Sequence, residues 1–291
     1  RTLGEALERC AGLVLTPGDH LAIRGFGQAN LVGGAGDASR ILLLIDGIRI
    51  NDVFADSFSV GLERGVLDVA RIEVMKGPGS ALYGTSAFVG VIQVVTLRGS
   101  DQVGMEGRAR LEGIASEALE LRAGGQLGLA EGALYGRAEG AGTSWLSQER
   151  VLELRGSLSR GSLSLLGGFL RSSSPRIDPP EETAASSGEA DEPAVQTGPP
   201  QLDRTAEQGY LSLQWERGLS SSLYAFTRAT MQIGHVAIPS RGVDVLEKRI
   251  GAEGRLRFRL ASRLRAIAGL GIRASRGRRA SSGRRVPRRN A

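Results

Sequence analysis

The sequence of 291 residues is poor in the residues that build covalent or metal-bound frameworks. Its single cysteine, Cys10, excludes an internal disulfide and a cysteine-based zinc site. The two histidines, His20 and His235, lie far apart in the sequence, so a metal site or a histidine-based catalytic dyad is not expected. Since no nucleophile–base pair and no cofactor loop is recognisable, we expect neither an enzyme nor a bound cofactor.

Long hydrophobic runs are also missing. No stretch of about eighteen apolar residues is present, which excludes a transmembrane helix. The segment Arg1–Arg9 is amphipathic from its first residue and lacks the apolar centre of a signal peptide. Because the chain does not begin with methionine, we expect a fragment of a longer protein, either truncated or frame-shifted, or a processed chain.

Net positive charge is confined to one end of the chain. The net charge is +6, but residues 273–291 hold eight arginines and no acidic residue, and the remaining residues carry a net charge of −2. We therefore interpret 274–291 as a basic tail outside the preceding domain. Nucleic-acid binding by this tail is an alternative function, but no aromatic residues interleave with the arginines, so a nucleic-acid partner is not expected.

Residues 1–98 have the pattern of a small mixed α+β unit. A short amphipathic helix near the start ends near Gly12, and turns rich in glycine and aspartate separate the runs that follow. These runs predict strands at Leu21–Arg24, Ile41–Asp46, Ala70–Met75 and Gly90–Thr96.

From about Met105 the pattern changes to segments with a period of two. In Tyr210–Glu216, for example, apolar side chains alternate with polar ones, as in a strand between two unlike solvents. A soluble β-sandwich or a packed barrel is the alternative, but its core face is usually richer in large aliphatic and aromatic side chains. The nine predicted strands are 105–114, 118–128, 132–141, 150–160, 162–172, 206–217, 222–233, 247–260 and 263–273.

The connections between these strands favour the membrane barrel. Every second connection is tight, whereas three of the others are longer, including 173–205, which is rich in proline, serine and glutamate. Short periplasmic turns that alternate with longer outer loops are typical of antiparallel membrane β-barrels. The predicted fold is therefore an incomplete antiparallel membrane barrel over 105–273, preceded by an α+β domain over 1–98.

Four motifs follow one another in the N-terminal unit. They are Ile23-Arg-Gly-Phe-Gly27, Arg40-Ile-Leu-Leu-Leu-Ile-Asp-Gly-Ile-Arg-Ile-Asn51, Leu67-Asp-Val-Ala-Arg-Ile-Glu-Val-Met-Lys-Gly-Pro-Gly-Ser-Ala-Leu-Tyr-Gly84 and Gly90-Val-Ile-Gln-Val-Val-Thr96. Their glycines alone indicate positive φ angles or close backbone approach, and none completes a phosphate-binding loop. Asp46-Gly47 is a hairpin-type turn.

In this order the motifs closely resemble the plug domain of TonB-dependent outer-membrane receptors, and the resemblance covers residues 1–98. The motif residues carried over are Arg24, Gly25, Asp46, Gly47, Arg71, Glu73, Gly77, Gly79 and Gly84. The resemblance implies that Arg71 and Glu73 of this chain form ion pairs with the barrel wall.

The resemblance implies active uptake across the outer membrane of a large, scarce solute such as a ferric siderophore or cobalamin. The implied partners are outer-membrane lipid, the solute and the TonB–ExbB–ExbD complex, although the chain contains no TonB box. A family barrel has about 22 strands, so nine strands form only its first part. The residues that bind the solute are not predicted, and a receptor that signals without transporting, or an inactive truncated fragment, are alternatives.

Overall fold

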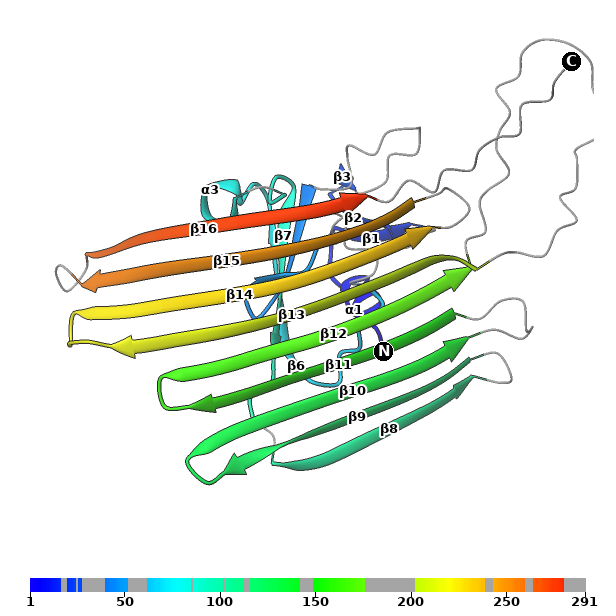
Figure 1. Cartoon of the computed structure of the whole chain (residues 1–291), viewed down its shortest axis with the longest axis horizontal. Helices are drawn as coiled ribbons and strands as arrows, with labels where there is room; N and C mark the ends of the chain where they lie inside the picture. The colour runs from blue at the N-terminus through cyan, green and yellow to red at the C-terminus, as the bar shows by residue number, and fades with distance from the viewer. Residues whose placement is uncertain are drawn as a thin grey trace, which may run out of the picture.

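The computed structural model describes most of the chain, and it consists of an N-terminal unit and a large antiparallel sheet (Figure 1). Gly25, most of the proline-rich segment and the end of the basic tail lie outside the described residues. The described residues are 1–16, 20–24, 26–27, 40–51, 62–84, 86–101, 103–112, 116–141, 149–175, 202–238, 243–259 and 264–279.

The N-terminal unit begins with a short helix, α1 (Leu3–Leu7), as the sequence pattern predicts. The Thr2 side chain caps this helix by accepting a hydrogen bond from the Glu5 N–H at 3.2 Å. A three-stranded antiparallel sheet follows. Its strands are β1 (Leu13–Thr16), β2 (His20–Ile23) and β3 (Phe26–Gly27).

A second sheet of the N-terminal unit has the strand order β5-β4-β7-β6. The five apolar residues of β4 are all buried, and β4 runs parallel to β7. Asp46 and Gly47 have φ angles of 48° and 76°, which the hairpin turn between β4 and β5 requires, so the predicted turn is present. The elements are β4 (Ile41–Ile45), β5 (Ile48–Arg49), β6 (Val69–Lys76), α3 (Ser80–Tyr83) and β7 (Gly90–Thr96).

The large sheet contains nine antiparallel strands in sequence order, from β8 at one edge to β16 at the other. The nine predicted strands are confirmed, but β16 continues to Arg279, six residues beyond the predicted end at 273. The strands are β8 (Gly104–Glu112), β9 (Ser116–Leu127), β10 (Ala130–Ala141), β11 (Glu149–Arg160), β12 (Leu163–Pro175), β13 (Leu202–Gly218), β14 (Leu223–Ile238), β15 (Val243–Arg259) and β16 (Arg265–Arg279).

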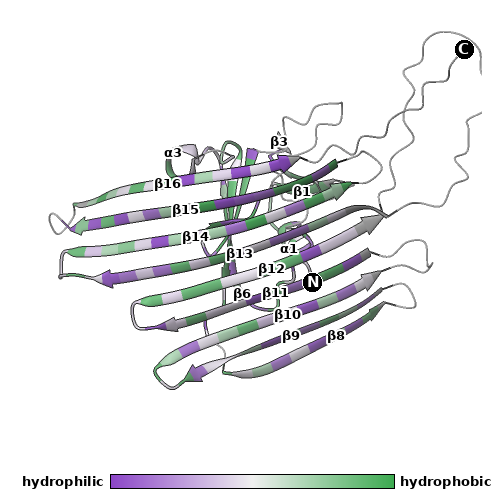
Figure 2. Ribbon diagram, viewed as in Figure 1, coloured by the Kyte–Doolittle hydropathy of each residue, from purple (hydrophilic) through white to green (hydrophobic). Residues whose placement is uncertain are grey.

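Hydrophilic and hydrophobic residues alternate along the strands of this sheet (Figure 2), and its two faces differ in chemistry. The face turned toward the N-terminal unit, here the inner face, carries charged residues such as Arg137 and Arg155, which are almost fully buried. The opposite, outer face exposes apolar side chains such as Leu213 and Ile250, with exposures of 52% and 59%. Among the described residues no helix is long and apolar enough to cross a membrane.

Asn51 extends the pairing of the buried strand β4 on the side where the short strand β5 pairs only with Leu44 and Ile45. Its Oδ1 atom accepts the Leu43 N–H and its Nδ2 atom donates to the Ile41 carbonyl, both at 2.9 Å, and the residue is fully buried. A side-chain amide thus takes the place of a neighbouring strand next to the part of β4 that β5 does not cover.

We predict that Asn51→Ala destabilises the N-terminal unit by about 2–4 kcal/mol, because two buried backbone groups of β4 lose their partners. Hydrogen exchange of the Leu43 amide, with chemical unfolding, measures this effect. Gln93→Ala is the matched control, since among the described residues the Gln93 side-chain amide donates only to the adjacent Val94 carbonyl, at 3.1 Å. Equal effects of the two substitutions would contradict the proposed role of Asn51.

Candidate functional site

The N-terminal unit is attached to the inner face through residues 63–68, here called the anchor segment. The Arg64 guanidinium forms an ion pair of 2.8 Å with Glu153 on β11, and the two side chains are only 1% and 0% exposed. The other carboxylate oxygen of Glu153 accepts the Gly65 N–H at 2.9 Å. One buried carboxylate therefore binds both a side chain and the backbone of the anchor segment.

Arg155, two residues along β11, binds the same segment. It donates to the Gly65 carbonyl at 2.7 Å, forms a close ion pair with Asp68 and stacks over the Tyr135 ring at 4.5 Å from its centroid. Burial raises the pKa of the Asp68 carboxyl to about 6, although the positive charge of Arg155 opposes this shift. Desolvation of the carboxylate therefore offsets part of the attraction in this ion pair.

Gly65 has no room for a side chain. A Cβ atom at this position would lie 1.7 Å from the hydroxyl oxygen of Tyr135, which donates a hydrogen bond of 3.0 Å to Glu120. Both backbone groups of Gly65 are bonded to β11, so glycine is required by close approach rather than by an unusual φ angle.

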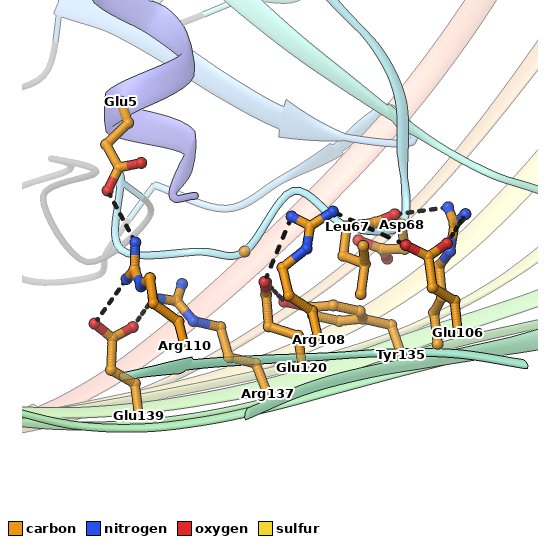
Figure 3. A network of polar contacts seen from close by, with 12 residues as sticks. Glu5, Leu67, Asp68, Glu106, Arg108, Arg110, Glu120, Tyr135, Arg137 and Glu139 are labelled. Carbon is orange, nitrogen blue, oxygen red and sulfur yellow. Dashed lines mark hydrogen bonds and ion pairs between the residues drawn. The ribbon is translucent and has the colours of Figure 1, made fainter. Parts of the chain in front are cut away.

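The start of the chain lies directly on the anchor segment. The Leu3 N–H donates to the Arg64 carbonyl at 2.7 Å, and Thr2 forms an antiparallel bridge with Gly65. Glu5 of α1 also pairs with Arg110 on β8 at 3.7 Å, and Arg110 in turn pairs with Glu139 (Figure 3). The first residues, the anchor segment and the sheet thus form one connected polar network.

Residues 46–51 form a second contact region with the sheet. Arg228 on β14 donates to the carbonyls of Gly47 and Asp46, at 2.7 and 2.9 Å. Gln232 donates to the Arg49 carbonyl at 2.6 Å, and Gln208 donates to the Ile50 carbonyl at 2.9 Å. In these contacts the sheet supplies side-chain donors and the N-terminal unit supplies backbone acceptors.

Arg71 and Glu73 lie elsewhere. They pair with one another at 2.6 Å on β6, the outermost strand of its sheet, and are 61% and 55% exposed. Within the described part of the chain, no hydrogen bond or ion pair joins either of them to the large sheet. The local pair satisfies both charges, and their ion pairs with a barrel wall stay a prediction.

The other motif residues shape turns. Gly77 and Gly84, at either end of the α3 region, have φ angles of 154° and 78°, and Arg24 has a φ angle of 53°. A Cβ atom at Gly79 would lie 2.4 Å from the Met75 side chain. Among the motif residues that the structure describes, only Asp46 and Gly47 join the interface with the large sheet.

The fold and this interface define a class of protein: a small α+β plug bound through polar contacts to the inner face of an antiparallel wall whose outer face is apolar. Comparison with known proteins agrees. Residues 1–91 match the family model described as the TonB-dependent Receptor Plug Domain. The chain therefore carries the plug and the first barrel strands of a TonB-dependent receptor, in an unclosed sheet, and such receptors are outer-membrane proteins.

Relatives and solved structures support this assignment. Two vitamin B12 transporters named BtuB, from two strains of Vibrio vulnificus, are 42% identical over 60 residues and 32% identical over 110 residues. These matches cover 21% and 34% of this chain but 10% and 18% of the relatives.

Two receptor structures share the fold across almost the whole chain. The ferric-catecholate import receptor Fiu from E. coli has a TM-score of 0.65 at 16% identity, and the siderophore receptor PirA from Acinetobacter baumannii has a TM-score of 0.66 at 16% identity. Each comparison covers 95% of this chain, and 46% and 45% of the respective receptor chains. The chain thus spans less than half of these receptors.

We predict that Glu153→Gln weakens the attachment of the plug by about 3–5 kcal/mol, because it leaves the buried Arg64 guanidinium without its carboxylate. Chemical unfolding, together with protease cleavage within residues 1–98 of the folded protein, measures the loss. The double variant Arg64→Met with Glu153→Gln should recover part of it, since the unpaired charge is removed.

Glu73→Gln is the matched control for this substitution. It removes the same charge from an ion pair that is more than half exposed, and such pairs contribute about 0–1 kcal/mol. A Glu153→Gln variant that is as stable as Glu73→Gln would show that the buried pair does not hold the plug.

Proposed function

We propose that this chain is part of an importer that carries a large, scarce solute across the outer membrane with energy from the TonB–ExbB–ExbD complex. The solute class that the relatives favour is a ferric siderophore or cobalamin, since their names describe vitamin B12 transport and siderophore import. A signalling receptor would share the same plug and wall, but no contact among the described residues favours it.

One observation carries the proposal: the plug is held against the wall by polar contacts. Tyr210 and Leu166 of the sheet pack against the apolar core of the plug, but the specific attachments are ion pairs and hydrogen bonds to backbone groups, such as Arg64 to Glu153 and Arg228 to Gly47. Water can replace such partners when two surfaces separate, whereas separation of an apolar interface would expose apolar area. An interface of this kind suits a plug that must move.

The geometry also offers a route for an applied force. Thr2 and Leu3 are attached to Arg64 and Gly65, so a pull on residues that precede them would act first on the anchor segment. Antiparallel pairing at this point consists of a single isolated bridge, which separates more readily than a long ladder. The start of the plug is therefore coupled directly to its most deeply buried contact with the wall.

We predict TonB-dependent uptake by the receptor that carries this chain. Cells that lack their own receptors for cobalamin and ferric siderophores, and that express this receptor, should accumulate one of these radiolabelled solutes. The accumulation should fall to background in an otherwise identical strain without TonB.

Two outcomes would contradict the proposal. Uptake that persists at full rate without TonB would exclude the energy coupling. Surface binding of a solute without accumulation, in cells with TonB, would favour a receptor that does not transport.

A further inference from the structure

The outer face carries a group of three cations on the last two described strands. Lys248 on β15 and Arg276 on β16 are register partners, and Arg278 follows two residues later on the same face. All three residues are exposed. We call Lys248, Arg276 and Arg278 the outer cationic cluster.

The charges of this cluster are not balanced within the described part of the chain. Another cation at this end of the outer face has an acidic neighbour, since Arg171 lies 3.5 Å from Glu207. Among the described residues no such contact is found for the outer cationic cluster. Like charges directly opposite one another on antiparallel strands are destabilising, so the pairing of Lys248 with Arg276 favours an anion between them.

Apolar side chains adjoin the cluster on the same face. Ile250 is two residues from Lys248, and Ile272 and Leu270 precede Arg276 at alternate positions of β16. Their exposures are 59%, 70% and 75%. Toward its C-terminal end β16 changes from apolar to hydrophilic (Figure 2). The cluster therefore lies where the apolar, membrane-facing part of these strands ends.

The cluster lies near the ends of the strands that the longer connections join. The two long connections, between Ala141 and Glu149 and between Pro175 and Leu202, join strands at this end, and the tight turn with Gly161 is at the other. In an outer-membrane barrel the longer loops face outward, so the cluster would lie in the outer leaflet. Basic residues at a membrane surface attract anionic lipids, and phosphate oxygens accept charge-assisted hydrogen bonds from Arg and Lys.

We propose that the outer cationic cluster binds the phosphate-bearing headgroup of an outer-leaflet lipid, whose acyl chains lie along Ile250, Ile272 and Leu270. This inference rests on the membrane placement of the proposed function, but it requires neither a particular solute nor TonB. It also gives a role to part of the basic C-terminal sequence. Arg276 and Arg278 alternate with Ser275 and Gly277, so the strand directs both arginines outward.

The test uses the full chain, folded in neutral detergent and placed in nanodiscs of phosphatidylcholine with a minority of phosphatidic acid. Native mass spectrometry counts the phosphatidic acid molecules that stay bound to the protein. The double variant Lys248→Gln with Arg276→Gln should bind phosphatidic acid roughly 30-fold more weakly, as expected for the loss of two cations beside an anionic lipid. The charge-preserving variant Lys248→Arg with Arg276→Lys should bind it nearly as well as the wild type.

The matched control is Arg160→Gln with Arg217→Gln. These two arginines are exposed on the outer face at the short-turn end, and their register partners are Leu163 and Ala225 rather than cations. The control should retain phosphatidic acid. An equal loss of phosphatidic acid binding in both double variants would show that the effect depends on surface charge in general, which would overturn the proposal.

Wild-type protein without preference for phosphatidic acid would also overturn it. The Lys248→Gln with Arg276→Gln variant is also tested for binding of an oligonucleotide. If it loses oligonucleotide binding but keeps phosphatidic acid, the proposal is likewise overturned. Because these assays contain neither solute nor TonB, a negative result leaves the proposed import untouched, and failed import leaves the lipid site untouched.

Discussion

The position of the plug depends on a buried set of charges between the anchor segment and β11. Arg64, Glu153, Arg155 and Asp68 form a chain of ion pairs from which water is largely excluded. A buried ion pair contributes little net stability compared with an apolar contact of the same size, because both charges must first be desolvated. It does impose a strict geometry, since any displacement leaves a charge buried without a partner. The ion pairs therefore determine the position of the plug, and they contribute less to the free energy of its attachment.

Glycine provides the close approach that this arrangement needs. Gly65 brings the plug backbone within hydrogen-bond distance of Glu153 and Arg155, which a side chain at that position would prevent. Where the chain passes from the plug to β8, a Cβ atom at Gly99 would lie 2.5 Å from the Gly132 carbonyl oxygen. The plug is thus in backbone contact with the wall both at the anchor segment and next to its covalent connection.

Much of the architecture could be predicted from the sequence, because each strand carries its own signal. Alternation of apolar and polar residues indicated all nine strands, and Asp46-Gly47 indicated its turn. The anchor segment could not be found in this way. Arg64 and Asp68 are charged residues in a short loop that carries no periodic pattern. Their partners, Glu153 and Arg155, follow almost ninety residues later. The alternation of that strand shows only that one of its faces is charged. Pairing of specific charges over such a separation depends on tertiary structure, which periodicity does not encode.

The end of β16 shows how local composition can hide a strand. The concentration of arginines without acidic residues predicts that residues 274–279 belong to a basic tail. The structure pairs these residues with β15 up to Val245↔Arg279, and the cations follow directly after the apolar part of the same face. A membrane strand must leave the hydrocarbon region at both ends, so its pattern has to change from apolar to polar on the outer face while the backbone ladder continues. The loss of apolar alternation therefore indicates the edge of the membrane layer, whereas the end of the strand is set by its hydrogen-bonded neighbour.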